Sequence, residues 1–318
     1  MSGKKIVVIG EILVEIMADT IGDGFREAQP LTGPFPSGAP AIFADQVARI
    51  GQPVALISAV GDDDFGRLNL DRLGRDGVDV SGVFVDTERP TGSAFVRYRG
   101  NGDRDFVFNI GHSAAGRLNV TDTVEALMAT ADHLHVTGSS LSSPEFVALN
   151  LRAAESVRSR GGTVSFDPNL RREILSAEGM PEAMSRMISM TDLYLPSGDE
   201  LTLLTGAITP EAAIEELLGL GVQAIVHKRG AIGASFHCGN GSHAVKAFPV
   251  DEVDPTGAGD CFGGTFTALW LRGMEPREAL RLAAASGALA VTRRGPMEGT
   301  ATLGELEAFA RRMTGAAR

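Results

Sequence analysis

Residues 251–266 have the sequence DEVDPTGAGDCFGGTF, and the two halves of this stretch favour different backbone conformations. In the first half Pro255 fixes its own φ and restricts the residue before it, while Gly257 and Gly259 leave the backbone free, so we expect a turn. From residue 258 onward apolar residues recur every four positions as far as Trp270, which predicts a helix with one buried stripe. The helix therefore begins within the glycines.

Asp260 lies in the first turn of this predicted helix. The first N–H groups of a helix have no intrahelical partner and carry the positive end of its dipole, so a loop of small residues entering a helix can bind an anion. Aspartate also occurs in first helical turns simply as a favourable charge. The flanking glycines favour a catalytic role, because a phosphoryl group needs bare backbone to approach and a nearby carboxylate can accept a hydroxyl proton.

Residues 254–260, DPTGAGD, are similar to the C-terminal signature D-x-T-G-A-G-D of the ribokinase-like (PfkB) family of carbohydrate kinases. This resemblance implies that Asp260 is the catalytic base. It further implies that the backbone amides of Gly257, Ala258 and Gly259 form an anion hole for the transferred phosphate, and that Thr256 contacts the nucleotide.

The composition limits the classes of protein to be considered. With 318 residues, of which 43% are hydrophobic, the chain can form one large domain with an appendage or two modest domains. A formal charge of −11 without any local run of Lys or Arg argues against a nucleic-acid partner. An acidic protein that handles ATP must form a local positive site from Mg²⁺, lysine and backbone amides.

The cysteines and the N-terminus predict a cytoplasmic protein without a membrane partner. The two cysteines, Cys238 and Cys261, are interpreted as reduced thiols. The apolar run at residues 6–9 is too short for a signal peptide or a membrane span.

Strand and helix patterns alternate along most of the chain, which predicts an α/β fold with a mostly parallel central sheet flanked by helices. Helices are expected at residues 144–158 and 210–218. Strands are expected at residues 6–9, 53–60, 133–137, 163–167, 193–196, 224–227 and 234–237.

Two segments depart from this alternation and predict a small β-sheet lid. Residues 12–36 are rich in Gly, Pro and Thr without helical periodicity, and residues 93–112 alternate around a Gly-Asn-Gly-Asp turn typical of a hairpin. The predicted organisation is therefore a ribokinase-like α/β domain formed by residues 1–11, 37–92 and 113–318, with the lid formed by residues 12–36 and 93–112.

Two clusters of potential metal ligands have simpler interpretations. The run Asp62, Asp63 and Asp64 precedes a helical pattern and is interpreted as helix capping. His133 and His135 share one face of a predicted strand and lack a third ligand at suitable spacing, so we expect packed histidines. We therefore expect no side chain to bind a metal ion directly.

Ser197 and Glu200 form an S-x-x-E pattern after a predicted strand, which is typical of a capping box. The same positions resemble an N-x-x-E motif of the family, whose Glu acts near Mg²⁺ and the phosphates. The resemblance implies that Glu200 contacts the cofactor, with Mg²⁺ held through water. Ser197 departs from the usual Asn.

Residues 228–234, KRGAIGA, join two predicted strands and resemble the K-x-G-x-x-G segment that lies beside the nucleotide in the family. The resemblance makes Lys228, Gly230 and Gly233 candidate ATP contacts. A hairpin loop would contain glycines in any case, and no P-loop motif occurs in the chain.

Residues 37–42, SGAPAI, are similar to the sugar-binding segment G-G-A-P-A-N of the family, with Ser37 and Ile42 as departures. Pro40 suits a first helical turn, so a ligand can approach the backbone at Gly38. Glu15 stands near the position of an Asp that binds sugar hydroxyls in many members.

Two further segments supply candidate substrate contacts. Residues 167–171, DPNLR, resemble the D-P-N-x-R stretch of the fructokinase and ketodeoxygluconate kinase branches, which makes Asp167 and Arg171 candidates. Asn109 lies in the sequence Phe-Asn-Ile-Gly at residues 108–111, where ketodeoxygluconate kinases tend to carry Tyr and Arg, and it is a candidate partner for a sugar hydroxyl.

Together the motifs predict an ATP-dependent sugar kinase that phosphorylates a primary hydroxyl of a ketohexose such as fructose or tagatose. Ribose is disfavoured because residues 37–42 contain no Lys. The alternative is a 2-keto-3-deoxygluconate kinase, whose acidic substrate needs a cation. The arginines that keep this alternative open are Arg97, Arg99, Arg104 and Arg171.

Two other classes of function fit the sequence less well than a kinase. A catalytically silent sugar-binding sensor on the same fold is the rival, and the intact Gly-Ala-Gly-Asp sequence argues against it. A dinucleotide oxidoreductase would need G-x-G-x-x-G after the first strand, which is absent. The resemblance also implies a homodimer through the lid, and a K⁺ ion near Asp254 and residues 294–296.

Overall fold

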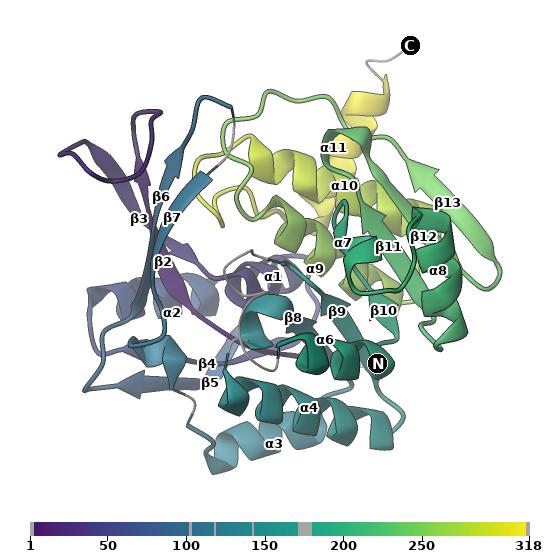
Figure 1. Cartoon of the computed structure of the whole chain (residues 1–318), viewed down its shortest axis with the longest axis horizontal. Helices are drawn as coiled ribbons and strands as arrows, with labels where there is room; N and C mark the ends of the chain where they lie inside the picture. Colours follow the sequence, from purple (N-terminus) through teal and green to yellow (C-terminus); the bar gives the residue numbers. More distant parts are fainter. Residues whose placement is uncertain (1–2, 102–103, 118, 142, 171–179, 316–318) are drawn as a thin grey trace.

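The computed structural model describes residues 3–101, 104–117, 119–141, 143–170 and 180–315 (Figure 1). Within these residues, nine strands form one sheet in the order β13-β12-β11-β10-β9-β8-β1-β4-β5. The strands from β11 to β5 are parallel, and β12 and β13 are antiparallel additions at one edge. Their bounds are β1 Ile6–Ile9, β4 Val54–Gly61, β5 Asp79–Asp86, β8 His133–Thr137, β9 Thr163–Asp167, β10 Leu193–Tyr194, β11 Ala224–Lys228, β12 Ala234–Cys238 and β13 Gly241–Val245.

Helices cover both faces of this sheet (Figure 1). Strand β1 shows why, because all four of its residues are buried and successive side chains enter different cores. Val7 and Ile9 pack with residues of α3 and α4, whereas Ile6 and Val8 pack with residues of α1 and α2. The helices are α1 Ala39–Arg49, α2 Asp64–Arg75, α3 Asp122–Thr130, α4 Pro144–Ser159, α6 Met180–Ser189, α7 Glu200–Leu203, α8 Pro210–Gly219, α9 Ala258–Leu271, α10 Pro276–Val291 and α11 Leu303–Gly315.

Helix α9 begins inside the glycines as predicted, but its burial exceeds the single stripe that the spacing indicated. Every residue from Cys261 to Leu269 is buried, including Gly263 and Gly264. A Cβ atom at Gly264 would lie 2.9 Å from the carbonyl oxygen of Phe43 in α1. The prediction of one stripe was wrong because α9 packs between α1, α10 and the sheet.

Two edge strands and one strand end also differ from the predictions. Neither β5 nor β13 was predicted, because both lie at sheet edges and lack a continuous apolar run. The predicted strand at residues 193–196 is confined to Leu193–Tyr194, since Pro196 and the turn at Gly198 end its regular pairing.

A second sheet has the order β3-β2-β6-β7 and stands apart from the large sheet in Figure 1. Its strands are β2 Leu13–Ala18, β3 Leu31–Ser37, β6 Gly92–Tyr98 and β7 Arg104–Asn109. The predicted hairpin is the antiparallel pair β6–β7, while β2 and β6 are parallel. The sheet therefore joins two segments that are far apart in the sequence.

The two acidic and histidine clusters have the structural roles expected of them. Asp63 is the N-cap of α2, and its Oδ1 accepts a hydrogen bond from the Gly66 amide at 2.8 Å. His133 and His135 are buried, and both contact the Ser165 hydroxyl at 2.8 Å. No group of three metal-ligating side chains is found among the described residues. In the same part of the chain, no helix has the length and apolar character needed to cross a membrane.

Asp45 in α1 provides a test of burial energetics. It is fully buried, it accepts hydrogen bonds from the Thr300 hydroxyl at 2.8 Å and Arg72 Nη2 at 3.4 Å, and burial raises its pKa to about 7. The folded protein thus holds a proton here that the unfolded chain releases at lower pH, so this group destabilises the fold as pH rises from about 4 to about 7.

We therefore expect Asp45→Asn to change the pH dependence of stability. Urea unfolding gives the free energy of unfolding of both proteins. The value for the variant minus the value for the wild type should be larger at about pH 8 than at about pH 5. A difference that does not change with pH, or that changes in the opposite sense, would contradict the assigned titration.

Candidate active site

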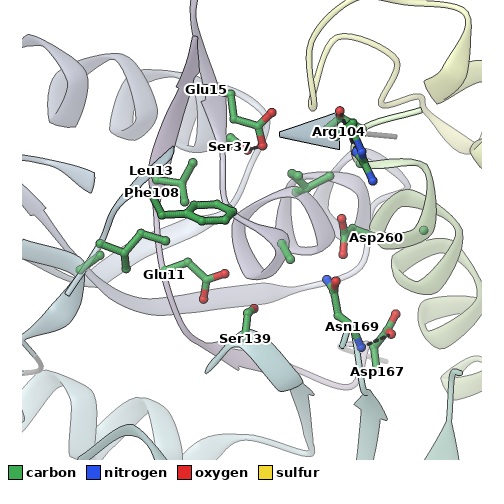
Figure 2. Close-up of a pocket in the computed structure, with 18 of the residues that line it drawn as sticks. Glu11, Leu13, Glu15, Ser37, Arg104, Phe108, Ser139, Asp167, Asn169 and Asp260 are labelled. Carbon is green, nitrogen blue, oxygen red and sulfur yellow. Dashed lines mark hydrogen bonds between the residues drawn. The ribbon is translucent and has the colours of Figure 1, made fainter. Parts of the chain in front are cut away.

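A cavity of about 480 Å³ lies between the large sheet and the second sheet. Its polar walls come from the carboxyl ends of parallel strands, where ligands bind in open α/β sheets. Asp167 and Lys228 are the last residues of β9 and β11, and Glu11 follows β1. Figure 2 shows Glu11, Glu15, Asp167 and Asp260 lining this one space.

The N-terminus of α9 forms one wall of the cavity. Gly257 is the N-cap with φ 79°, and a Cβ atom there would lie 2.3 Å from the Pro296 carbonyl oxygen. Glycine is therefore required by both conformation and space. Gly257, Gly259 and Asp260 line the cavity, and the Asp260 carboxylate faces into it (Figure 2). Ala258 lies between them on the backbone, and its side chain packs against the core of β1 and α1.

Beside this helix end lies a charged cluster formed by the buried Lys228 and Asp167 and the half-buried Glu200. Lys228 Nζ donates to Asp167 Oδ2, and the two side chains are 9% and 5% exposed. Burial would lower the pKa of Lys228, but Asp167 and Glu200 outweigh it and raise that pKa. The predicted nucleotide contact and the predicted substrate contact are thus bound to each other.

Glu200 is held by two backbone donors. Its Oε1 accepts from the Leu170 amide at 2.6 Å and its Oε2 from the Ser197 amide at 2.7 Å. Burial and the charge of Asp167 raise the pKa of Glu200, and Lys228 opposes this effect. The predicted capping box is only half present, because Asp199 rather than Ser197 is the N-cap of α7.

The opposite end of the cavity is lined by carboxylates from the second sheet and its approach. Glu15 on β2 is 4% exposed and accepts a hydrogen bond from the Ser37 hydroxyl at 2.8 Å. Ser37, which departs from the family pattern, therefore supplies a donor for the longer Glu15 side chain. A Cβ atom at Gly38 would lie 2.4 Å from the Glu11 carbonyl oxygen, so only glycine fits there.

Comparison with known proteins identifies the family. A model described as pfkB family carbohydrate kinase matches residues 3–303. The chain belongs to the pfkB family. The predicted ribokinase-like fold and the predicted carbohydrate kinase are therefore confirmed.

Two curated relatives of this pfkB protein are sugar kinases of different specificity. The 2-dehydro-3-deoxygluconokinase of Thermoproteus tenax is 34% identical over 305 residues, covering 92% of this chain and 90% of that protein. Fructokinase-1 of Zea mays is 31% identical over 317 residues, covering 96% and 97%.

Solved pfkB-like structures include complexes with ligands. An E. coli protein provisionally named Ribokinase II, in complex with ATP and Mg²⁺, has a TM-score of 0.91 and 48% identity, covering 97% of this chain and 99% of that one. A Vibrio cholerae fructokinase double mutant bound to fructose, ADP and a potassium ion has a TM-score of 0.83 and 26% identity, covering 97% and 99%.

Most of the predicted site residues of this pfkB chain meet in the cavity, but some do not. Gly230 and Gly233 lie in the β11–β12 turn, outside the cavity lining. Asn109 lines a separate hollow, and its Nδ2 lies 3.4 Å from the Ser93 hydroxyl. Arg171 lies outside the described residues. The residues that do line the cavity are Glu15, Gly38, Asp167, Glu200, Lys228, Thr256, Gly257, Gly259 and Asp260.

The motifs alone did not identify several residues that line the cavity. Glu11 lies two residues after the end of buried strand β1, a position whose polar residue could have been recognised as lying at the ligand-binding edge. Asn169, which belongs to the DPNLR stretch but is not among its candidate residues, also lines the cavity and has a φ of 40°. Arg104, which the sequence offers only as a cation for an acidic substrate, faces the Asp260 side of the cavity in Figure 2.

The residues present fit a nucleotide with Mg²⁺. An ideal Cβ atom on Gly259 would lie 3.8 Å from Lys228 Nζ, so a positive charge and bare helix-end amides are adjacent. Glu200 is one half-buried carboxylate that belongs to no group of three potential metal ligands among the described residues. This donor set suits Mg²⁺, which keeps waters and phosphate oxygens as ligands.

Proposed function

We propose that this pfkB protein transfers the γ-phosphate of ATP to a primary hydroxyl of a ketohexose such as fructose or tagatose. The observation that carries the proposal is the shared cavity, in which Asp260 and the α9 amides lie with Glu15 and Gly38. Phosphoryl transfer needs mainly alignment and charge stabilisation, and this arrangement supplies both.

Asp260 is proposed to take the proton of the attacking hydroxyl. The amides of Gly257, Ala258 and Gly259 would stabilise the charge that develops on the transferred group, with Thr256 and Lys228 beside them. Glu200 would orient Mg²⁺ through water, and the bound metal would neutralise phosphate charge. Gly230 and Gly233 remain candidates for contacts with more distant parts of the nucleotide.

The sugar would lie at the end of the cavity lined by Glu11 and Glu15 and would extend toward Asp167 beside the start of α9. Carboxylates accept hydrogen bonds from sugar hydroxyls and repel a substrate carboxylate. These charges favour a neutral ketohexose over an acid sugar.

A second candidate substrate is 2-keto-3-deoxygluconate, which the relative in Thermoproteus tenax and Arg104 support. Arg97 Nη1 donates to the Gly24 carbonyl at 2.7 Å, and Arg99 Nε donates to Asp105 at 2.9 Å, so neither side chain is directed to the cavity. Arg104 is thus the candidate cation for a carboxylate among the described arginines.

A lid, a homodimer and a cytoplasmic location are also proposed for this protein. The second sheet, with residues 12–36 and 93–112, would act as a lid that excludes water from the domain of residues 1–11, 37–92 and 113–318. Leu31 and Val107 on this sheet are 42% and 47% exposed, which supports a homodimer through the lid. Acidity and low cysteine content support a cytoplasmic location without nucleic-acid partners.

A K⁺ ion near Asp254 is proposed as a further cofactor. Asp254 is buried, and its hydrogen-bond donors are the uncharged Tyr98 hydroxyl and the amides of Thr256 and Gly295. A monovalent cation would balance this buried charge.

The proposal is tested by ADP release over a panel of fructose, tagatose, 2-keto-3-deoxygluconate, ribose and nucleosides with Mg-ATP. We expect the highest kcat/KM with fructose or tagatose. A tenfold higher value for the acid sugar, about 1.4 kcal/mol in transition-state binding, would reverse the ranking. Arg104→Gln should then weaken the acid sugar selectively, and sugar binding without any ADP release would instead indicate the silent sensor.

A further inference from the structure

The turn end of the β6–β7 hairpin, where β6 ends and β7 begins, contacts the loop that leads into α9. Tyr98 and Arg104 are directly opposite each other in this hairpin. The Tyr98 hydroxyl donates to Asp254 Oδ1 at 2.5 Å and lies 3.2 Å from the Thr256 hydroxyl oxygen. Arg104 Nη1 donates to the same Thr256 oxygen at 3.4 Å. One cross-strand pair of the second sheet therefore contacts the helix-end loop through two side chains.

Asp254 connects three segments at this point. It is 1% exposed, and its Oδ1 also accepts from the Thr256 amide at 3.0 Å. Its Oδ2 accepts from the Gly295 amide at 2.9 Å. Asp254 lies only three residues before Gly257. These hydrogen bonds therefore fix the position of the backbone that leads into the amides at the start of α9.

The direction of the Tyr98 hydrogen bond is settled by its surroundings. Burial and the acceptor Asp254 raise the pKa of the Tyr98 phenol above its usual range. The phenol therefore remains protonated and acts as the donor to the carboxylate, a charge-assisted bond of the stronger kind.

Strand β6 also connects Tyr98 to the sugar end of the cavity. It pairs in parallel with β2, where Glu15 lies opposite Ala94. The end of β2 has its own contact with the same region, since Arg294 Nη2 donates to the Ala18 carbonyl at 3.3 Å. Strand β2, which lines the sugar end, and its neighbour β6 thus terminate beside Asp254 and its partner Gly295.

We infer that Tyr98 is a positioning residue, which couples occupation of the sugar end, through β2 and β6, to the alignment of the α9 amides. This inference rests on the proposed kinase function. When sugar holds the second sheet in place, the Tyr98 hydroxyl keeps Asp254 and the loop after it in the orientation required for transfer. Without the hydroxyl, sugar still binds, but the loop is aligned less often.

The test is Tyr98→Phe, which removes one oxygen atom and keeps the aromatic ring. We expect kcat to fall about tenfold, the equivalent of one hydrogen bond to a charged group, while KM for ATP stays within about twofold. In the wild type, saturating sugar should slow amide exchange in residues 12–36, 93–101, 104–112 and 254–260. In Tyr98→Phe the first three segments should still respond, and residues 254–260 should respond less.

The matched control is Arg99→Gln, next to Tyr98 in sequence. The Arg99 side chain is 47% exposed and pairs with Asp105 on the second sheet, away from the helix-end loop. This variant should keep wild-type kcat and the wild-type exchange response.

The outcomes separate the inference from the proposed function. No ADP release by the wild type with any sugar would argue against the kinase itself. The role of Tyr98 would be overturned if the wild type phosphorylates sugar and Tyr98→Phe has the same kcat and the same amide exchange at residues 254–260. A lower thermal midpoint with unchanged kcat would overturn it too, since the hydroxyl would then serve stability alone.

Discussion

Asp260→Asn is expected to lower kcat by ~10²- to 10⁴-fold, because loss of a general base removes that much rate, while the affinity for ATP changes little. Asn has the size of Asp but cannot accept the hydroxyl proton. Asp260 lines the cavity at the first turn of α9, where the amides of Gly257 and Gly259 also face. Steady-state ADP release with the preferred sugar gives kcat, and calorimetric titration gives ATP affinity.

Asp64→Asn is the matched control for this prediction. Asp64 also lies in the first turn of a helix, α2, but its side chain is 96% exposed and it lies outside the cavity. Any effect of removing a charge at a helix end would appear in this variant too. An Asp260→Asn enzyme that keeps more than about half of the wild-type kcat would rule out the assigned base.

Lys228→Met should be the most destabilising of the proposed substitutions, lowering the free energy of unfolding by about 3 to 5 kcal/mol. The lysine is bonded to Asp167 and lowers the pKa of Glu200; Lys228 and Asp167 are buried, and Glu200 is half-buried. Methionine fills a similar volume but leaves the buried carboxylates without a counter-charge. Urea unfolding measures the change, and kcat should fall in parallel because the positive charge beside Gly259 is lost.

Two companion measurements separate charge from packing. The double variant Lys228→Met/Asp167→Asn should recover part of the lost stability, because the carboxylate that needed the lysine is gone. In Lys228→Met the folded-state pKa of Glu200 exceeds its unfolded value further than in the wild type, so the folded protein binds more protons. Lowering the pH from about 7 to about 5 should then reduce the difference in free energy of unfolding between Lys228→Met and the wild type. A double variant as unstable as the single one, with no effect of pH, would contradict the assigned pairing.

Local rules were sufficient for several features of this protein. The turn and helix start at residues 254–260 were predictable because proline and glycine restrict or free the backbone wherever they occur. Asp63 was predictable as a cap since capping involves residues three apart. The buried run in β1 indicated a central parallel strand, and the family motifs placed Asp260, Glu200 and Lys228 at one site.

Tertiary structure alone decided which side chains meet. Lys228 and Asp167 are 61 positions apart, and Tyr98 and Asp254 are 156 apart, so no local pattern links either pair. The outward position of Asn109 depends on how β7 pairs with β6, because one step along a strand reverses the face of a side chain. Sequence motifs specify the chemistry of each segment through short-range backbone preferences. Charge pairing across the cavity depends on the packing of strands that are far apart in the sequence and meet only in the folded chain.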